Sequence, residues 1–99
     1  MADNPQYHLY LLLCDDSILY TGIAIDPLER LKQHQNGHPH GAKFTRRFKR
    51  LELVYYVKTG GRSMAQKLEY HFKKCTRKKK MEIIKKNPSL EKLKAMILT

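Results

Sequence analysis

Cysteines, acidic residues and long apolar runs are all scarce in this chain of 99 residues. Its two cysteines, Cys14 and Cys75, do not form a Cys-x-x-Cys spacing, so neither a disulfide framework nor a zinc knuckle is predicted. No apolar run approaches the roughly 20 residues of a transmembrane helix. Residues 1–6 also lack the basic start and the apolar segment of a signal peptide. We therefore expect a cytoplasmic protein, or a nuclear one in a cell with a nucleus.

The shortage of acidic residues gives the chain a strong positive charge. It has 20 lysines and arginines against nine acidic residues, for a net charge of +11. This balance implies an anionic partner, either nucleic acid or a membrane surface. A membrane surface favours one basic amphipathic helix, whereas the charge here is spread over several segments. The composition therefore favours nucleic acid as the partner and predicts no membrane binding.

The first part of the chain is predicted to form a β-hairpin. Residues 7–14 are apolar on both faces, which is typical of a buried strand, and residues 18–25 are rich in strand-forming residues. A loop of three turn-forming residues joins them. This loop length places Tyr10 opposite Gly22, and it puts Tyr10 and Tyr20 on the same face of the sheet.

Gly22 lies on the face that carries the two tyrosines and has two interpretations. Glycine within a strand is unfavourable, and it often marks the close approach of another group. It either leaves room for a ligand or permits a tight packing contact.

A helix is predicted directly after the second strand. Asp26 is a suitable N-cap, Pro27 suits the first helical position, and Gly37 ends the helix about three turns later. Arg30 and His34 stand four residues apart and lie side by side on this helix. An arginine next to a histidine indicates a site that handles phosphate.

The rest of the chain predicts one more strand and further helices. The strand covers residues 51–58, and Ser63 caps a helix over residues 64–74. The basic run at 76–80 is a turn or the start of another helix, and Ser89 caps a last short helix. These elements predict an α/β (α+β) fold with a small three-stranded antiparallel sheet flanked by helices. We divide the chain into a flexible N-terminus (1–6), a domain (7–85) and a C-terminal helical extension (86–99).

Two basic segments are candidates for nucleic-acid binding. In residues 36–50, basic side chains alternate with phenylalanines, which is typical of a surface that binds a nucleic-acid backbone, although a solvated loop has the same composition. Residues 76–80 add to the same electrostatic footprint. The candidate nucleic-acid-binding residues are Lys43, Arg46, Arg47, Lys49, Arg50, Arg77, Lys78, Lys79 and Lys80.

Glu69 is the single acidic residue of the helix predicted over residues 64–74. Lys73 stands four residues further on, so a surface ion pair is one interpretation of this glutamate. The other interpretation comes from the order of the motifs along the whole chain.

This order resembles the GIY-YIG endonuclease superfamily, most closely its small stand-alone single-domain bacterial branch. The residues that carry the resemblance are His8-Leu9-Tyr10 at the first motif, Tyr20-Thr21-Gly22 at the second, Arg30, His34, Gly41-Ala42-Lys43 and Glu69. The first motif keeps only its tyrosine, and the second keeps its first and last residues. No single motif is specific, but the ordered set with its spacings is, and it covers about residues 7–85.

The resemblance implies an endonuclease whose catalytic residues are Tyr10, Tyr20, Arg30, His34 and Glu69. Glu69 would hold a single Mg²⁺ or Mn²⁺ ion, and Arg30 would donate to the phosphate oxygens. One of the two tyrosines would act as general base, with its pKa lowered from about 10 by nearby cations, Arg30 and Lys43 in particular. The choice between the tyrosines stays open, and His34 would either orient a tyrosine or take the proton itself.

The implied substrate is DNA, which a monomer or weak homodimer would nick in DNA repair or recombination. Because we identify no separate recognition domain, we expect selectivity for branched or single-stranded DNA, or a protein partner that supplies specificity. The competing interpretation is a non-catalytic basic module that only holds nucleic acid. That module would explain the positive charge, but it would have no use for Glu69.

Overall fold

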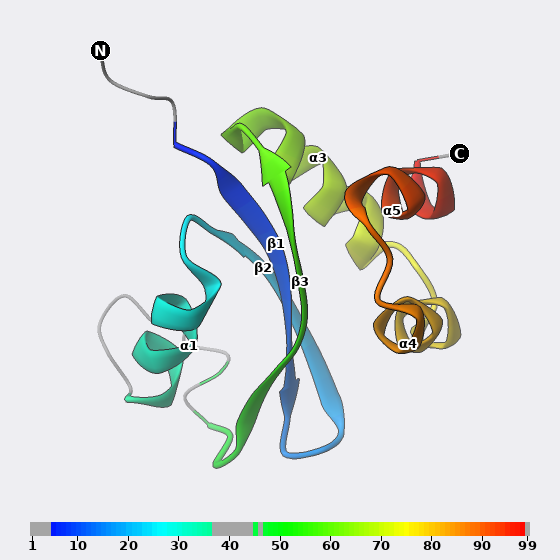
Figure 1. The fold of residues 1–99 in the computed structure, drawn as a ribbon. Helices are drawn as coiled ribbons and strands as arrows, with labels where there is room; N and C mark the ends of the chain where they lie inside the picture. The colour runs from blue at the N-terminus through cyan, green and yellow to red at the C-terminus, as the bar shows by residue number, and fades with distance from the viewer. Residues whose placement is uncertain (1–4, 37–44, 46, 99) are drawn as a thin grey trace.

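A three-stranded antiparallel sheet forms the centre of the molecule (Figure 1). The computed structural model describes residues 5–36, 45 and 47–98. The strands are β1 (Tyr7–Cys14), β2 (Ile18–Ala24) and β3 (Leu51–Gly60), in the spatial order β2-β1-β3. Four helices accompany the sheet in the described residues: α1 (Pro27–Gln35), α3 (Arg62–Lys73), α4 (Arg77–Lys86) and α5 (Leu90–Ile97). The predicted α+β fold is confirmed.

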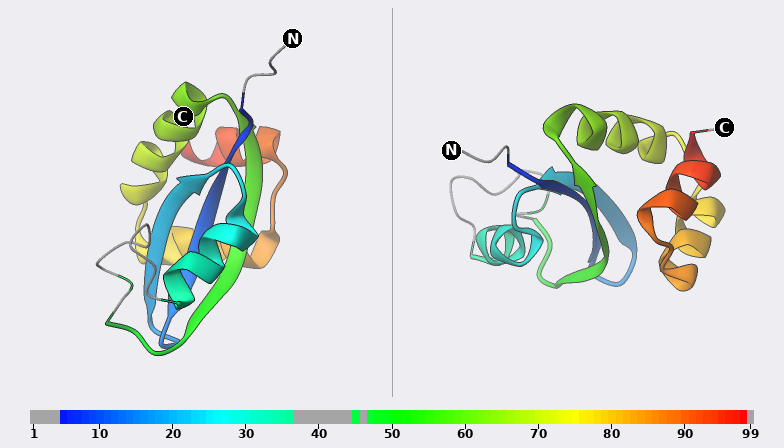
Figure 2. Two further views of the ribbon diagram at one scale, coloured as in Figure 1. Left: turned by 90° about the vertical axis from the view of Figure 1, so that its left-hand side faces the viewer. Right: turned by 45° about the horizontal axis from the view of Figure 1, so that its top comes forward.

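The helices cover the two faces of the sheet unequally. Helix α1 lies on one face, and α3, α4 and α5 lie on the other, as the two further views make clear (Figure 2). Strand β1 is the middle strand and is therefore enclosed between both layers. Among the described residues, no helix has the length and apolar content needed to cross a membrane.

The β1–β2 hairpin has the predicted register. Tyr10 pairs with Gly22 and Leu12 pairs with Tyr20, which places the two tyrosines on one face. Asp15 and Asp16 form the turn with positive φ angles of 49° and 60°, a conformation that aspartate tolerates better than most residues.

The hairpin turn also holds the chain that leads into β3. The Asp15 carboxylate accepts hydrogen bonds from the backbone N–H groups of Lys49 (3.0 Å) and Arg50 (2.7 Å). The Asp15 N–H in turn donates to the Arg50 carbonyl (2.8 Å). Three hydrogen bonds thus fix the point at which the chain enters the sheet.

The helix boundaries follow the capping residues, with one correction. Asp26 caps α1 by accepting from the Glu29 N–H at 3.2 Å, as predicted, and the helix ends at Gln35, while Gly37 lies outside the described residues. Ser63, in contrast, is not the N-cap of α3. Gly61 takes that position without a side-chain cap, and α3 begins at Arg62.

The early start of α3 has a conformational cause. Strand β3 runs on to Gly60, whose φ of +99° is open to glycine and strained for other residues, and this turns the chain at once. The basic run at 76–80 is confirmed as the start of a helix, because Thr76 caps α4 by accepting from the Lys79 N–H. Ser89 caps α5 in the same way.

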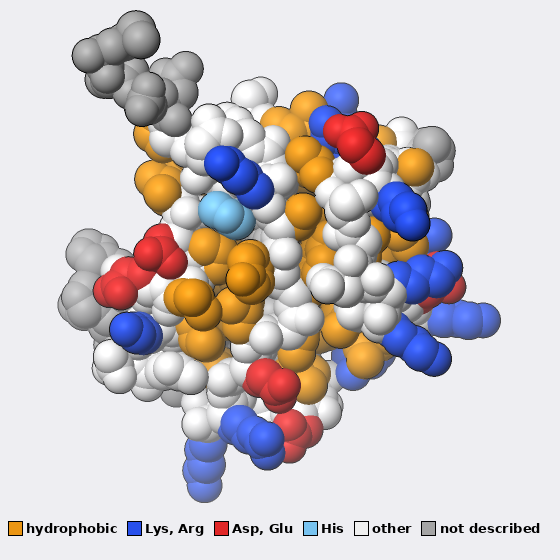
Figure 3. Space-filling model, in the orientation of Figure 1, with side chains coloured by type: hydrophobic (Ala, Val, Ile, Leu, Met, Phe, Trp, Pro, Cys, Tyr) orange, Lys and Arg blue, Asp and Glu red, His pale blue; other side chains and the backbone are white. Residues whose placement is uncertain are grey.

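One surface of the molecule combines exposed apolar and basic side chains. In Figure 3, apolar side chains are exposed between α1 and β3, and lysine and arginine side chains gather over α4 and α5. Leu28 of α1 and Tyr56 of β3 are more than half exposed. The basic residues of α4 are thus presented at the surface.

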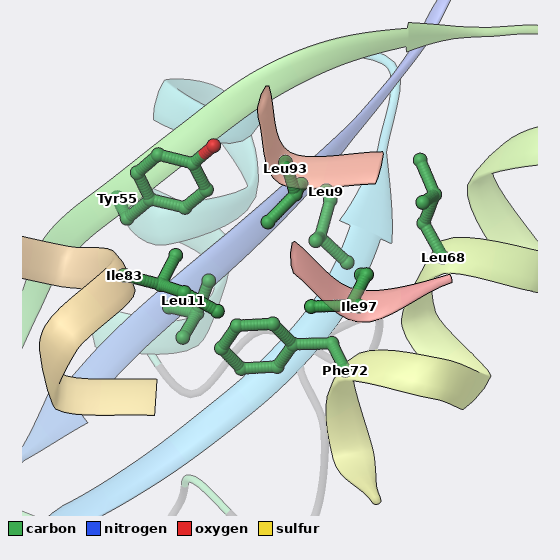
Figure 4. Packing of buried hydrophobic residues seen from close by; sticks show 8 residues of the cluster. All are labelled: Leu9, Leu11, Tyr55, Leu68, Phe72, Ile83, Leu93 and Ile97. Atoms are coloured by element: carbon green, nitrogen blue, oxygen red, sulfur yellow. The ribbon is translucent and has the colours of Figure 1, made fainter. Parts of the chain in front are cut away.

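The larger hydrophobic core lies between the sheet and helices α3 to α5 (Figure 4). Its buried members come from five elements: Leu9, Leu11, Tyr55, Leu68, Phe72, Ile83, Leu93 and Ile97. Leu93 and Ile97 belong to α5, so the predicted C-terminal extension contributes to the same core as the strands, while its separation as a domain stays a prediction. The Tyr55 hydroxyl donates to the Pro88 carbonyl at 2.8 Å, which ties the α4–α5 connection to β3.

Candidate active site

Tyr10 occupies the smaller core, between the sheet and α1. It is 1% exposed and packs with Leu12, Cys14 and Leu51. Its ring lies directly over Gly22: a Cβ atom added at position 22 would stand 2.6 Å from the Tyr10 hydroxyl oxygen and 2.7 Å from Cζ. Of the two interpretations of Gly22, the structure therefore supports the tight packing contact, because the ring of Tyr10 fills the space.

His34 joins Tyr10 to a third buried residue. Its Nε2 atom lies 3.0 Å from the Tyr10 hydroxyl, and its Nδ1 atom lies 2.8 Å from the Thr45 hydroxyl. His34 is 2% exposed and Thr45 is 1% exposed, so solvent does not compete for these hydrogen bonds. We call Tyr10, His34 and Thr45 the inner triad.

Three accessible side chains lie in front of the inner triad. Tyr20 of β2 and Arg30 of α1 are partly buried, and the Glu69 side chain of α3 is 24% exposed. The Tyr20 ring lies edge-on to His34, with 5.4 Å between ring centroids, and 6.4 Å from the Tyr10 ring. We call Tyr20, Arg30 and Glu69 the outer group.

Electrostatics bring the two sets together. The charges of Arg30 and Glu69 both act on the pKa of Tyr10 and on the pKa of Tyr20, in opposite directions. Because such effects fade with distance, the guanidinium and the carboxylate lie near both hydroxyls. The five candidate catalytic residues, drawn from β1, β2, α1 and α3, thus lie within electrostatic range or in contact around the two tyrosines.

The tyrosine pKa values differ from the expectation. Burial raises the pKa of Tyr10, and the neighbouring Tyr20 raises it further, while hydrogen bonding and charge from Arg30 oppose the change. Burial likewise raises the pKa of Tyr20 against the opposing effect of Arg30. The prediction that nearby cations leave a tyrosine with a lowered pKa is therefore wrong, because desolvation outweighs the cation. Lys43, the other predicted cation, lies outside the described residues.

The same burial acts on His34 in the opposite sense. Desolvation, assisted by the positive charge of Arg30, lowers the pKa of His34 from 6.5 to about 4. Its imidazole is therefore neutral at physiological pH and has one nitrogen that accepts a proton.

Glu69 forms the ion pair that its spacing predicts, and it also lies near the two tyrosines. Its carboxylate lies 3.5 Å from the Lys73 ammonium, the helical pair expected from their spacing. It also acts electrostatically on both tyrosines. A surface pair of this kind is worth only about 0.3–0.5 kcal/mol, which a divalent ion with its greater charge readily exceeds.

The donor set fits one hydrated metal ion rather than two clustered ions. In the described part of the chain, no group of three or more histidines, cysteines, aspartates or glutamates is arranged to hold a metal. Among the residues that the structure describes, Glu69 is the one that offers a partly exposed carboxylate beside the tyrosines. A single carboxylate with several retained waters is a usual way to hold Mg²⁺.

Comparison with known proteins identifies the domain. The family model described as the GIY-YIG catalytic domain matches residues 6–82. The chain belongs to the GIY-YIG family. A UPF0213 protein of Yersinia enterocolitica is 43% identical over 89 residues, which cover 90% of this chain and 89% of the relative. A UPF0213 protein of Citrobacter koseri is 38% identical and covers 94% of this chain and 91% of its own.

Two solved structures share the GIY-YIG fold of this chain. The solution structure of a protein from E. faecalis has a TM-score of 0.56 at 39% identity, and the match covers 87% of this chain and 90% of that one. The solution structure of a UPF0213 protein from Bacillus halodurans has a TM-score of 0.52 at 32% identity, covering 81% and 83%. The predicted family is confirmed, and with it the broad prediction of an endonuclease domain acting on nucleic acid.

The predicted nucleic-acid-binding residues of this GIY-YIG chain do not share one environment. Lys80 reaches the candidate site, where it lines a pocket with Tyr20 and Lys73. Lys79 forms an ion pair with Glu82. Those exposed at the surface are Arg47, Lys49, Arg50, Arg77 and Lys78, and of these Arg50 pairs with Asp16 at 3.3 Å. Lys43 and Arg46 lie outside the described residues.

Two residues beside the candidate site were not predicted to belong to it. Thr45 stands inside a basic segment, and its partner His34 lies eleven residues away in another element, so no periodicity connects them. Lys73 was interpreted only as the ion-pair partner of Glu69, whereas it also lines the pocket beside Tyr20. The one sequence feature that distinguishes Thr45 is that it is a neutral hydroxyl residue within a basic segment.

Proposed function

We propose that this chain is a divalent-metal-dependent endonuclease that nicks DNA, with selectivity for branched or single-stranded structure, in DNA repair or recombination. The observation that carries the proposal is the assembly of Tyr20, Arg30 and Glu69 in front of the buried Tyr10–His34 hydrogen bond. Cleavage of a phosphodiester needs an activated water, charge stabilisation at phosphorus and help for the leaving oxygen. These five side chains supply each requirement.

Arg30 and Glu69 serve the charged parts of the reaction. The Arg30 guanidinium presents a planar set of donors for the non-bridging phosphate oxygens, whose negative charge grows in the transition state. Glu69 would hold the single Mg²⁺ or Mn²⁺ ion, which when bound supplies Lewis-acid polarisation and stabilises the leaving 3′ oxygen.

Exposure distinguishes the roles of the two tyrosines. Tyr10 is 1% exposed and bonded to His34, so it does not reach water, whereas Tyr20 is partly exposed. Tyr20 is therefore the tyrosine that faces the nucleophile. Neither phenol ionises readily, because burial raises the pKa of each.

Proton removal then depends on the neutral imidazole of His34. A hydrogen bond links the hydroxyls of Tyr20 and Tyr10, and a second one links Tyr10 to Nε2 of His34. The attacking water gives a proton to the Tyr20 hydroxyl, the Tyr20 proton passes to Tyr10, and the Tyr10 proton passes to Nε2. Both phenols end neutral and His34 ends as imidazolium, while the new hydroxide attacks phosphorus and the bond to the 3′ oxygen breaks.

A nicking assay tests the proposal. Supercoiled plasmid and branched oligonucleotides are incubated with the protein in Mg²⁺, Mn²⁺ or EDTA, alongside the Glu69→Ala variant. We expect nicking only with a divalent ion, and its abolition in Glu69→Ala with DNA affinity unchanged. Glu82→Ala is the matched control, because Glu82 is a glutamate in an ion pair with lysine on the neighbouring helix α4. Undiminished cutting by Glu69→Ala would contradict this mechanism.

The net charge of +11 supports one other candidate, a non-catalytic module that only holds nucleic acid. Such a module would bind DNA with an affinity that falls steeply with salt, with a logarithmic slope of about −0.9 for each phosphate contact. It would show no nicking with any divalent ion. The same assay, with binding measured in parallel, separates the two candidates.

A further inference from the structure

We propose that Thr45 is a positioning residue of the nuclease site: its hydroxyl accepts the Nδ1–H of His34 and thereby keeps Nε2 free to accept the Tyr10 proton. This inference rests on the proposed function, in which His34 is the final proton acceptor. It assigns a role to a residue that no motif of the family resemblance includes. The inference also states which atom donates in each hydrogen bond of His34. The positions of the heavy atoms alone do not determine this direction.

Each imidazole nitrogen lies within hydrogen-bond distance of a buried hydroxyl. Nδ1 lies 2.8 Å from the Thr45 oxygen, and Nε2 lies 3.0 Å from the Tyr10 oxygen. All three residues are at most 2% exposed, so bulk water does not substitute for either hydroxyl. Because a neutral imidazole carries one N–H and one bare nitrogen, one hydroxyl must accept and the other must donate.

The surroundings of Tyr10 decide which hydroxyl donates. The Arg30 guanidinium lies near enough to the Tyr10 oxygen to oppose the rise of its pKa, and a guanidinium only donates. In the proposed proton path Tyr20 also donates to the Tyr10 oxygen, so the phenolic proton of Tyr10 is directed to Nε2 of His34, at 3.0 Å. A bare Nε2 requires the proton on Nδ1, where the Thr45 oxygen accepts it.

The alternative tautomer would block the proton transfer. With the proton on Nε2, His34 would donate to the Tyr10 oxygen, which already receives Arg30, and no bare nitrogen would face the phenols. Without the Thr45 oxygen the Nδ1–H of His34 would lose its acceptor, so Thr45 stabilises the productive tautomer without touching substrate. Its action is indirect, through the imidazole, so we expect the chemical step to be sensitive to it and DNA binding not to be.

The test uses two substitutions at one position. Thr45→Val keeps the shape of the side chain and removes the hydroxyl, whereas Thr45→Ser keeps the hydroxyl and removes a methyl group. We expect Thr45→Val to lower the single-turnover rate constant about 100-fold with unchanged DNA affinity. Thr45→Ser should restore the rate to within a few-fold of the parent.

Thr59→Val is the matched control for this substitution. Thr59 is also a buried threonine, and its hydroxyl donates to the Tyr7 carbonyl at 3.0 Å, at the other end of β3 from Thr45. Both variants therefore lose one buried hydroxyl hydrogen bond. We expect Thr59→Val to change stability but to leave the cleavage rate near that of the parent.

A spectroscopic measurement tests the tautomer independently of activity. In metal-free protein, ¹⁵N NMR of the His34 side chain, identified by its absence from His34→Gln, should show a protonated Nδ1 and a bare Nε2. Thr45→Val should shift His34 towards the other tautomer, and Thr45→Ser should not.

The outcomes separate this inference from the proposed function. If the parent does not nick DNA, the proposed function fails, while the NMR spectrum still reports the tautomer. A parent with the proton on Nε2 overturns the inference, as does a Thr45→Val protein whose tautomer and rate match those of the parent. A shifted tautomer with an unchanged rate shows that the hydrogen bond is structural only, which also overturns it.

Discussion

The inner triad and the outer group differ in burial although they lie side by side. Tyr10, His34 and Thr45 are almost completely buried, and hydrogen bonds link them through the two nitrogens of His34. The outer group is accessible and is linked by charge. The difference indicates that the two sets have separate roles in one site. The buried residues set the direction of proton transfer, and the accessible residues contact the substrate.

This division has an energetic consequence. A buried polar group that loses its partner pays the cost of desolvation, whereas an exposed charge regains water. Substitutions in the inner triad should therefore lower the free energy of unfolding, and substitutions in the outer group should lower activity while leaving the fold intact. Each of the following experiments tests one side of this division.

The largest effect is expected for Arg30→Ala. Removing the guanidinium from the developing phosphate charge should slow single-turnover nicking by about 10²- to 10³-fold, or about 3–4 kcal/mol. Arg30→Lys should recover only part of this rate, because an ammonium lacks the planar set of donors. The free energy of unfolding in urea should change by less than about 0.5 kcal/mol. Lys32→Ala, on an exposed position of the same helix, is the control.

A stability loss as large as the activity loss would place Arg30 with the buried residues and break the comparison.

The second prediction concerns the acid sensitivity of the fold through His34. Its pKa is lowered from 6.5 to about 4 in the folded protein, so between these values the unfolded chain binds the extra proton and the folded chain does not. Stability is therefore highest above pH 6.5 and falls as the pH drops towards 4, with a loss of about 3 kcal/mol from this group.

Urea unfolding from pH 4 to 7 measures this effect, and His34→Gln supplies the baseline without the titration. Parallel curves for the two proteins would show that burial of the imidazole does not control its protonation.

The third prediction concerns Gly22→Ala. The added Cβ would meet the hydroxyl oxygen and Cζ of Tyr10 at 2.6 and 2.7 Å, which requires the buried ring to move. Overpacking of this kind costs about 2 kcal/mol in the free energy of unfolding. Gly61→Ala is the control, because no atom lies within 4 Å of its added Cβ and the φ of Gly61 is −71°. Equal stability of the two variants would contradict the close packing of Tyr10.

The smallest expected loss in the free energy of unfolding distinguishes the two tyrosines. Tyr10→Phe removes the partner of the buried Nε2 atom and should lower the free energy of unfolding by about 1 kcal/mol. Tyr20→Phe should change stability less, because this side chain is partly exposed. Both variants should lose most of the nicking, because each removes one hydroxyl of the proton path. The comparison would fail if Tyr20→Phe were the less stable protein, and the proton path would fail if Tyr10→Phe nicked DNA like the parent.

Much of the fold could be predicted because its determinants are local. A three-residue loop sets the register that pairs Tyr10 with Gly22, and Asp26 sets the start of α1. The start of α3 could not be predicted in the same way. Ser63 has the correct capping chemistry, but the positive φ of Gly60 turns the chain and begins the helix before it.

The residues of the candidate site could be predicted from the sequence, but their burial and their pKa shifts could not. The spacing of the motifs brought together Tyr10, Tyr20, Arg30, His34 and Glu69. Burial, which decides the direction of the tyrosine pKa shifts, depends on how the small core closes around the ring of Tyr10. Thr45 was missed for the same reason, since its contact with His34 exists only once the chain before β3 has folded back onto α1.

The hydrogen bonds of Asp15 at the hairpin tip help to hold the His34 imidazole in place from a distance. This carboxylate anchors the backbone at Lys49 and Arg50, only a few residues beyond Thr45. Loosening the anchor would let Thr45 drift from Nδ1 although no residue of the cleft had been altered. A substitution at the hairpin tip would therefore slow proton transfer, although the hairpin tip lies at a distance from every group that contacts DNA.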